Sequence, residues 1–229
     1  MHHSLRWLLP LLVAVVALPP AAATSFFSIP GGLNVQVPVA SMQEQRTRGT
    51  LLQQYDFSCG SAALATLLSH HYGRKVNEQE VLEAMYATGD QQKIRKEGFS
   101  MLDMKRYLES LGYAADGFQQ TLDKLAQARL PAIVLVNESN YHHFVVVKGM
   151  RDGRVLIGDP SRGLRTMDRA DFEEAWVGGL LFVIHNRIEE ARFDLAEEWQ
   201  AVPRSPLGAA VRFEGLAGPG LPKHGPGDF

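Results

Sequence analysis

The spacing of hydrophobic positions changes once along the chain, from a helical period in the first half to short β-branched runs in the second. From Cys59 to Arg129, apolar side chains recur at spacings of three and four residues, and glycine or proline ends each stretch. This spacing is typical of helices that bury one face. It predicts helices over about 58–73, 77–89, 100–112 and 121–129.

Two of these helices carry a start signal. Asn77 precedes Glu80 by three positions, and Ser100 precedes Asp103 by three. In a capping box, the first side chain accepts a hydrogen bond from the backbone N–H three residues on, and the later side chain bonds back to the first backbone N–H. We therefore expect helices to begin at these two positions.

The stretch after Pro131 has the composition of β-strands. Short runs rich in valine and isoleucine, bounded by turn residues, predict strands at 132–136, 144–147, 155–157 and 180–184, with a short helix near 168–176. Helices that precede the strands, instead of alternating with them, favour an α+β fold over an α/β fold. The prediction is an α+β fold with N-terminal helices packed on an antiparallel sheet.

The chain divides into segments of different composition. Residues 1–23 have a basic start, an apolar stretch and a small-residue end, which predicts a cleaved signal peptide and an exported, periplasmic product. The apolar stretch is shorter than the ~20 residues of a membrane span, so no stable span is expected after cleavage. The other segments are an N-terminal extension with one edge strand (24–50), a folded domain (51–187), and a charged, then Pro- and Gly-rich flexible tail (188–229).

Composition and charge narrow the function classes. With 45% hydrophobic and 21% charged residues among 229, the chain is typical of a globular protein. Its formal net charge of -2 leaves no basic excess for a phosphate backbone, so no nucleic-acid partner is expected. The single cysteine, Cys59, excludes an internal disulfide and a cysteine-rich zinc site. We expect neither a metal nor a cofactor.

Cys59 stands at the predicted start of the first helix, directly after Ser58 as the presumed N-cap. Unpaired backbone N–H groups and the helix dipole favour an anion there, so we expect a lowered thiol pKa and a nucleophilic thiolate. Gly60 is expected to leave room for a substrate backbone. The alternative is a buried structural cysteine, and position alone does not separate the two.

A nucleophilic thiol needs a base close by, and few histidines qualify. His70 and His71 lie too far along the same predicted helix as Cys59 to reach back, and we expect them only to end that helix, where cations are favoured. Adjacent residues of a strand point to opposite sides, so at most one histidine of the pair 142–143 can face the site. The remaining candidates are His142, His143 and His185.

The turn at residues 151–153 decides which histidine meets a carboxylate. A three-residue loop with Gly153 in the left-handed conformation would place Asp159 on the face of His143, as a diagonal neighbour. A two-residue loop would place Asp159 on the face of His142. Gly153 favours the first register, in which Asp159 orients the base. The alternative is that Asp159 is only a turn residue.

Three separated motifs carry a resemblance to a known family. They are Gln53-Gln54-Tyr55-Asp56-Phe57-Ser58-Cys59-Gly60, His143-Phe144-Val145-Val146-Val147 and Gly158-Asp159-Pro160. In this order they resemble the bacteriocin-processing (double-glycine leader) cysteine peptidases, over about residues 53–184. The chain departs from the family pattern at Ser58, where an acidic residue is usual. This departure leaves the catalytic positions intact and suggests a distinct subgroup.

The resemblance implies a papain-like fold and a Cys/His/Asp triad. Under it, the nucleophile, the base and the orienting carboxylate are Cys59, His143 and Asp159. The family motif selects His143 over His142. It also implies that Gln53 stabilises the oxyanion, with Gln54 as the competing candidate, because only the family spacing separates the two.

The resemblance also bears on the substrate and the location. Behind a predicted signal peptide, the chain is most similar to stand-alone periplasmic peptidases of functional-amyloid export systems. This implies an endopeptidase that cuts a protein or peptide of a secretion or amyloid-assembly pathway, after Gly-Gly. Self-processing after Gly32 is a further hypothesis. Two other classes stay open: a non-catalytic module on the same fold that binds a leader peptide, and an acyl transferase that uses the same triad.

Overall fold

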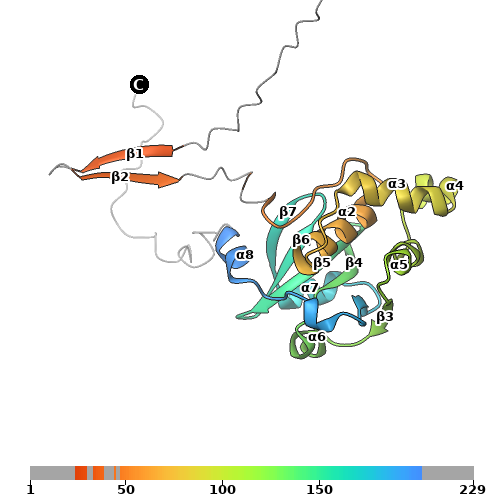
Figure 1. The fold of residues 1–229 in the computed structure, drawn as a ribbon. Coiled ribbons are helices and arrows are strands. Elements are labelled where there is room, and N and C mark those ends of the chain that lie inside the picture. The colour runs from red at the N-terminus through yellow and green to blue at the C-terminus, as the bar shows by residue number, and fades with distance from the viewer. Residues whose placement is uncertain (1–23, 30–32, 39–43, 45–46, 203–229) are drawn as a thin grey trace, which may run out of the picture. The chain divides into compact units, whose positions relative to one another are not determined.

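The computed structural model describes residues 24–29, 33–38, 44 and 47–202 (Figure 1). The chain forms two units, Met1–Ser41 and Met42–Phe229. The expected signal peptide and the part of the expected tail from residue 203 onward lie outside the described residues. Signal cleavage, self-processing after Gly32 and a flexible tail stay predictions.

The first unit contains two antiparallel strands, β1 (Thr24–Ile29) and β2 (Leu33–Pro38). The sequence pattern predicts a loop with one edge strand here, and the structure adds a second strand. The alternation of Val35 and Val37 signals β2. In β1, two adjacent phenylalanines break the period of two that predicts a strand.

Helices fill the first half of the second unit, as the hydrophobic spacing predicts. They are α2 (Cys59–Thr66), continued by the π-helix η1 (Leu67–His71), α3 (Glu78–Thr88), α4 (Gln91–Glu97), α5 (Met101–Ser110) and α6 (Leu122–Ala128). Asn77 and Ser100 form the two predicted capping boxes, with Glu80 and Asp103. Within the described ranges, none of the helices combines the length and the apolar character needed to cross a membrane.

The hydrophobic spacing does not predict α4. Asp90 caps this helix, since its carboxylate accepts hydrogen bonds from the backbone N–H groups of Gln92 and Lys93 at 3.1 Å each. Ile94 is its buried residue. One buried position gives no period, so the signal for α4 lies in its cap alone.

A six-stranded antiparallel sheet fills the second half, in the order β3-β8-β4-β5-β6-β7. Its strands are β3 (Ala115–Gln119), β4 (Ala132–Glu138), β5 (Tyr141–Arg151), β6 (Arg154–Asp159), β7 (Gly163–Asp168) and β8 (Leu180–Ile184), and α7 (Arg169–Ala175) precedes β8. The predicted α+β class with an antiparallel sheet is confirmed. Its two edge strands, β3 and β7, are not predicted because exposed and half-buried residues interrupt their apolar pattern.

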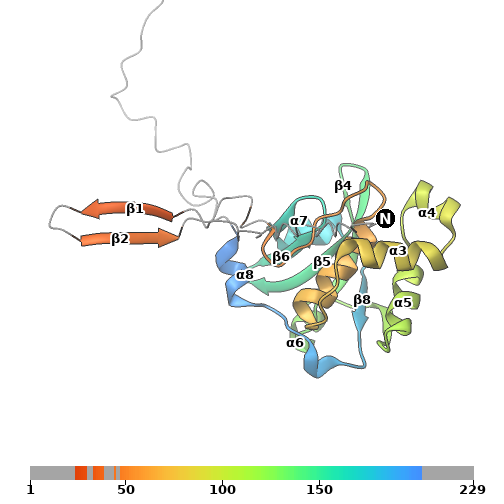
Figure 2. The same cartoon turned by 45° about the horizontal axis from the view of Figure 1, so that its top comes forward.

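The sheet lies between two hydrophobic cores. Figures 1 and 2 show the helices that lie beside the sheet. Helices α2, α3 and α5 contribute to the first core, through residues that include Leu64, Val81 and Met104. Helices α6 and α7 contribute to the second, through Leu125 and Phe172. Successive residues of the run 144–147 belong alternately to the first and the second core. This run is therefore buried on both sides, which explains why it is continuously apolar.

The segment 188–202 differs from the expected charged tail, because it packs on the domain. It contains the short helices η2 (Ile188–Glu190) and α8 (Ala196–Ala201). Ala201 and Val202 are buried in a third, small core, and Glu198 forms a buried ion pair with Lys148 of β5. The partner of Glu198 is distant in sequence, so no local pattern reveals that this charge is buried.

His71, at the end of η1, is fully buried and neutral, contrary to the expectation that this helix end favours charged histidines. Its Nδ1 lies 2.6 Å from the carbonyl oxygen of Arg192, and its Nε2 is buried without a hydrogen-bond partner. Burial, reinforced by the charge of Lys148, lowers the pKa of His71 to about 3 and that of His70 to about 4.

The buried His71 predicts sensitivity to acid. An unfolded chain protonates this imidazole near pH 6.5 and the folded chain only near pH 3, so the folded state binds fewer protons in between. The stabilising contribution is therefore complete above about pH 6.5 and is lost as the pH falls, by up to about 1.4 kcal/mol per pH unit. We expect the free energy of unfolding of His71→Gln, measured with urea, to fall less steeply than that of the wild type between about pH 7 and pH 4. The exposed His142→Gln is the control, and an equally steep loss in both variants would contradict the prediction.

Candidate active site

The chain before Cys59 turns sharply, and Ser58 holds the turn. Ser58 occupies the N-cap position of α2, as predicted, but its side chain makes no hydrogen bond to the helix. Its hydroxyl instead donates to the carbonyl of Tyr55 at 3.0 Å and accepts from the N–H of Tyr55 at 3.2 Å. This leaves the first backbone N–H groups of α2 available to the Cys59 thiol.

The Cys59 side chain is 8% exposed, and burial raises the pKa of its thiol. Backbone N–H groups of Phe144, Gly60 and Cys59 itself favour the thiolate but do not cancel the rise. The expectation of a lowered pKa is therefore wrong for the isolated thiol, because desolvation of the anion outweighs the helix N-terminus. The thiol needs a proton acceptor to become a nucleophile.

Gly60 serves packing instead of substrate access. A Cβ at this position would lie 3.0 Å from Cβ of Phe99 and 3.3 Å from Cε of Met104. Both are buried residues of the first core. The expectation that Gly60 leaves room for a substrate backbone is wrong, since the missing side chain lets α2 pack closely on this core.

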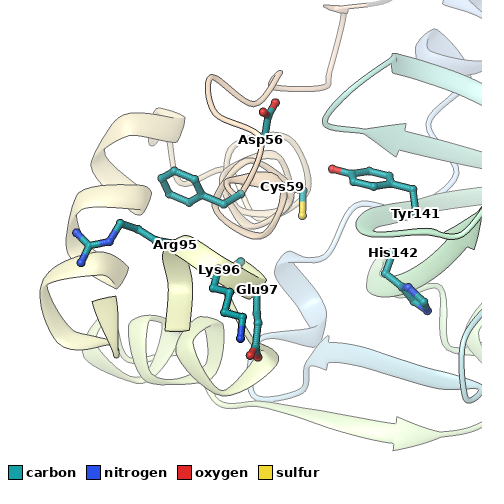
Figure 3. A pocket seen from close by; sticks show the side chains of 9 residues that line it. Asp56, Cys59, Arg95, Lys96, Glu97, Tyr141 and His142 are labelled. Atoms are coloured by element: carbon teal, nitrogen blue, oxygen red, sulfur yellow. The ribbon is translucent and has the colours of Figure 1, made fainter. Parts of the chain in front are cut away.

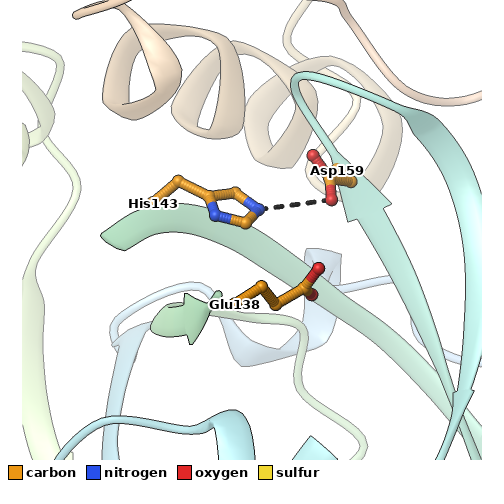
Figure 4. A group of neighbouring side chains, drawn as sticks. All are labelled: Glu138, His143 and Asp159. Atoms are coloured by element: carbon orange, nitrogen blue, oxygen red, sulfur yellow. Dashed lines mark hydrogen bonds and ion pairs between the residues drawn. The ribbon is translucent and has the colours of Figure 1, made fainter. Parts of the chain in front are cut away.

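His143 of β5 and Asp159 of β6 form a buried pair (Figure 4). Nε2 of His143 lies 3.3 Å from Oδ2 of Asp159, and the two side chains are 1% and 0% exposed. Nδ1 of His143 is buried without a hydrogen-bond partner, whereas the neighbouring His142 is exposed. One ring nitrogen thus faces a carboxylate, and the other is available to accept a proton.

The β5–β6 turn is shorter than predicted. Arg151 pairs with Arg154, so the loop has two residues, 152–153, with φ of 51° and 72°. These positive values at both positions fit a type I′ turn, which the Asp-Gly pair favours. In a regular ladder, this loop would place Asp159 on the face of His142.

A β-bulge restores the predicted pairing. Between Val147 and Gly149 the register shifts by one residue, which leaves Lys148 without a partner in the ladder. Beyond the bulge, Asp159 lies on the face of His143, where the two side chains meet. The prediction that Asp159 pairs with His143 is therefore confirmed, but the three-residue loop on which it rested is wrong.

Asp159 uses both carboxylate oxygens. Oδ1 accepts hydrogen bonds from the N–H of Ser161 at 2.9 Å and from its hydroxyl at 2.7 Å. Oδ2 accepts one from Nε of Arg165 at 2.9 Å, besides facing His143. Burial alone would raise the pKa of Asp159, but the hydrogen bonds from His143 and Ser161 and the charge of Arg165 hold it well below its usual range. The side chain is therefore an anion at neutral pH.

The Cys59 thiol and the His143 ring lie in one neighbourhood. One of the backbone N–H groups that favour the Cys59 thiolate belongs to Phe144, the residue after His143. The Tyr141 ring stacks on the His143 ring, with centroids 5.3 Å apart, and lines the same cavity as Cys59. In the part of the chain that the structure describes, no hydrogen bond joins Sγ of Cys59 to His143. The thiol and the imidazole are therefore related through Tyr141 and Phe144, and not by a direct hydrogen bond.

Gln53 is half-buried, and the competing Gln54 is exposed. The backbone N–H of Gln53 donates to the carbonyl of Pro160 at 2.9 Å, which ties this segment to the turn after Asp159. Its side-chain Nε2 donates to the carbonyl of Tyr55 at 2.9 Å, while its Oε1 is buried without a partner. In this structure the amide therefore points at the turn before Cys59.

A cavity of about 390 Å³ opens beside Cys59, between the end of α4 and the start of β5 (Figure 3). Figure 3 shows the sulfur of Cys59 directed into the space between these two walls. The sequence does not predict the α4 wall, and the cap at Asp90 is its one local signal. The lining residues are Asp56, Phe57, Cys59, Arg95, Lys96, Glu97, Gly98, Tyr141 and His142.

Glu138, His143 and Asp159 have the donor atoms of a metal site, within 4.8 Å of one another. The guanidinium of Arg165, however, already bonds both carboxylates of the group. A cation bound there would have to displace this arginine. The cluster is therefore better described as a network of ion pairs than as a metal site.

Comparisons with known proteins show the family of the chain. A family model described as "Peptidase C39 family" matches residues 48–187. A relative from Pseudomonas aeruginosa, named "Probable functional amyloid protease FapD", is 41% identical over 177 residues, which are 77% of this chain and 78% of that protein. The lactococcin-G-processing and transport ATP-binding protein LagD of Lactococcus lactis is 28% identical over 135 residues, or 58% of this chain and 18% of that protein.

One solved structure similar to the chain is the peptidase domain of Streptococcus ComA, described as a bi-functional ABC transporter involved in quorum sensing. Its TM-score is 0.49 at 24% sequence identity, and the match covers 59% of this chain and 96% of that domain. The match to the family model ends at residue 187, so the packed segment 188–202 lies beyond it.

Proposed function

The chain belongs to the peptidase C39 family and is a cysteine peptidase, and on that premise we propose which residues cut the peptide bond and what they act on. Cys59 is the nucleophile, His143 is the general base and acid, and Asp159 orients His143. Gln53 stabilises the oxyanion. The observation that supports this assignment is the buried His143–Asp159 pair, whose second ring nitrogen has no hydrogen-bond partner, while the backbone of the next residue, Phe144, favours the Cys59 thiolate.

The proposed reaction has two halves. First, Nδ1 of His143 takes the proton of the Cys59 thiol, and the thiolate adds to the scissile carbonyl carbon. The imidazolium then gives this proton to the leaving amine, which leaves a thioester on Cys59. In the second half, His143 takes a proton from water, the hydroxide attacks the thioester, and the thiol regains the proton as the carboxylic acid departs. Asp159, an anion at neutral pH, stabilises the imidazolium at each stage.

We extend the proposal to the substrate and the location. A protein of a functional-amyloid or secretion pathway is the proposed substrate, and the 41% identity to a protein named as a functional amyloid protease supports it. Cleavage after Gly-Gly and export to the periplasm behind residues 1–23 belong to the same proposal. The cavity beside Cys59 has room for a few residues of an extended peptide.

A second candidate is a module that binds a peptide without cutting it. One observation favours it: burial raises the pKa of the Cys59 thiol, so the thiolate is scarce until a base acts. The unpartnered nitrogen of His143 is what favours the peptidase over this module.

Peptide mapping separates these candidates. The purified chain is incubated with a peptide of about 20 residues centred on Gly-Gly, and with a matched Ala-Ala peptide. Mass spectrometry should find a new free carboxyl end after Gly-Gly, and none after alkylation of Cys59. Binding detected by fluorescence anisotropy without any cut peptide would support the binding module. Products joined to an added amine, instead of a free carboxyl end, would support an acyl transferase.

Gln53 gives a further prediction for this site. We expect Gln53→Ala to lower kcat by about 10²–10³-fold with little change in KM, because an oxyanion donor acts on the transition state. The exposed Gln54→Ala should stay within about twofold and is the matched control. Steady-state kinetics on the Gly-Gly peptide measure both. A larger loss in Gln54→Ala would move the oxyanion role to that residue.

A further inference from the structure

Arg165 of β7 links Asp159 to a second carboxylate. Its Nε donates to Oδ2 of Asp159 at 2.9 Å, and another of its guanidinium nitrogens donates to Glu138 at the end of β4. Arg162 also pairs with Glu138. Figure 4 shows Glu138 and Asp159 both directed toward the neighbourhood of the His143 ring. The carboxylate of Asp159 on β6 is thus contacted by His143 from β5 and by Arg165 from β7.

The bond lengths indicate what sets the orientation of Asp159. The contact between Asp159 and His143 measures 3.3 Å, whereas the bonds from Ser161 and Arg165 measure 2.7–2.9 Å. Charge-assisted hydrogen bonds are shortest where they are strongest. Ser161 fixes one oxygen and Arg165 fixes the other, so these two residues orient the carboxylate plane without any contribution from His143.

The charges of the network balance. Asp159 and Glu138 are matched by Arg165 and Arg162, and the Arg165 side chain is 19% exposed. Burial alone would raise the pKa of Glu138, but Arg165 and Arg162 reverse this effect and lower it. The network therefore carries no net formal charge, and Arg165 holds the Asp159 carboxylate by a directed hydrogen bond as well as by its charge.

We propose that Arg165, anchored by Glu138, is a positioning residue that fixes the Asp159 carboxylate for His143. The inference rests on the catalytic role proposed above for Asp159. Without Arg165, Oδ2 loses its short bond, and the carboxylate turns about the contacts with Ser161. A displacement of about 1 Å between catalytic groups costs on the order of 10²-fold in rate.

A double-mutant cycle tests the inference on the full chain with the Gly-Gly peptide. Arg165→Gln is made alone and together with Asp159→Asn. We expect Arg165→Gln alone to lower kcat by about 10- to 100-fold at unchanged KM. In the Asp159→Asn background it should cause no further loss, because the group through which it acts is already disabled. The kcat of Arg165→Lys should lie between those of Arg165→Gln and the wild type, because lysine keeps the positive charge but lacks the planar guanidinium that bonds two carboxylates at once.

Arg162→Gln is the matched control. The Arg162 guanidinium bonds Glu138, whereas its contact with Asp159 is a backbone hydrogen bond that the substitution leaves intact, so the kcat of Arg162→Gln should stay within about twofold of wild type. Equal losses of kcat from Arg165→Gln in both backgrounds would overturn the inference. A full kcat in Asp159→Asn alone would instead contradict the proposed triad, which is a separate result. If circular dichroism shows that Arg165→Gln does not fold, the cycle is repeated with Glu138→Gln in place of Arg165→Gln, and that result decides.

Discussion

Replacing His143 with alanine is expected to lower kcat/KM by about 10⁴–10⁶-fold, and Cys59→Ala should cause a loss of the same order. Without His143, the thiol keeps its proton, because burial raises the pKa of Cys59 and the proposed base is gone. The leaving amine would also lack a proton donor. Initial rates with a quenched fluorescent Gly-Gly peptide measure these losses.

The adjacent histidine provides a matched control. His142 is exposed and lines the cavity, so His142→Ala should change kcat/KM by no more than a few fold. The double variant of Cys59 and His143 should be no slower than either single variant, since residues that act as one unit are not additive. A large loss in His142→Ala with an active His143→Ala would reassign the base. If kcat/KM falls in both His142→Ala and His143→Ala together with the unfolding temperature, the substitutions have destabilised the strand instead of removing a catalytic group.

The choice between the two histidines shows how far sequence reasoning reaches. Alternation along a strand correctly predicts that they face opposite sides. The hairpin count then predicts that Asp159 joins His143, which is confirmed, although the loop has two residues. The bulge at Lys148 compensates for the shorter loop. A bulge depends on which side chains the surroundings bury, so no local pattern reveals it.

The pKa of Cys59 illustrates a different limit. The helix start is a local feature and is visible in the sequence, and so is its tendency to favour an anion. The depth at which the thiol is buried depends on how α2 packs against β5, which the sequence does not reveal. Here desolvation is the larger effect, so a prediction made from local features alone has the wrong sign.

The remaining parts of the site come together only in three dimensions. The α4 wall of the cavity has one buried residue and no period, and Arg165 and Glu138 come from strands that are far apart in the chain. The motifs around Cys59, His143 and Asp159, by contrast, could be found because each is a short contiguous run. The sequence therefore predicts the reacting groups, and the structure adds the residues that surround and orient their side chains.

The largest expected loss of stability comes from removing the ion-pair partner of Lys148, the residue at the bulge. Lys148 is fully buried, donates to the carbonyl of Gly49 and pairs with Glu198 of α8. Burial lowers the pKa of Lys148 and raises that of Glu198, and the attraction between the two charges opposes both shifts. Glu198→Ala should therefore leave a buried ammonium without its counter-charge and lower the free energy of unfolding by about 3–5 kcal/mol.

Urea unfolding of the full chain at neutral pH measures this loss, with the exposed Glu197→Ala as the matched control, expected to cost under about 0.5 kcal/mol. Lys148→Met combined with Glu198→Leu should recover most of the stability, because an apolar pair of similar volume removes the desolvation cost of both charges. A loss below about 1 kcal/mol in Glu198→Ala would contradict the prediction, because even the release of the Lys148 proton at neutral pH would cost several kcal/mol relative to the unfolded chain, in which lysine titrates at about pH 10.4. A fall in stability as the pH is lowered, steeper in Glu198→Ala than in wild type, would show that Lys148 is neutral in the folded variant, since the unfolded chain then binds one proton more.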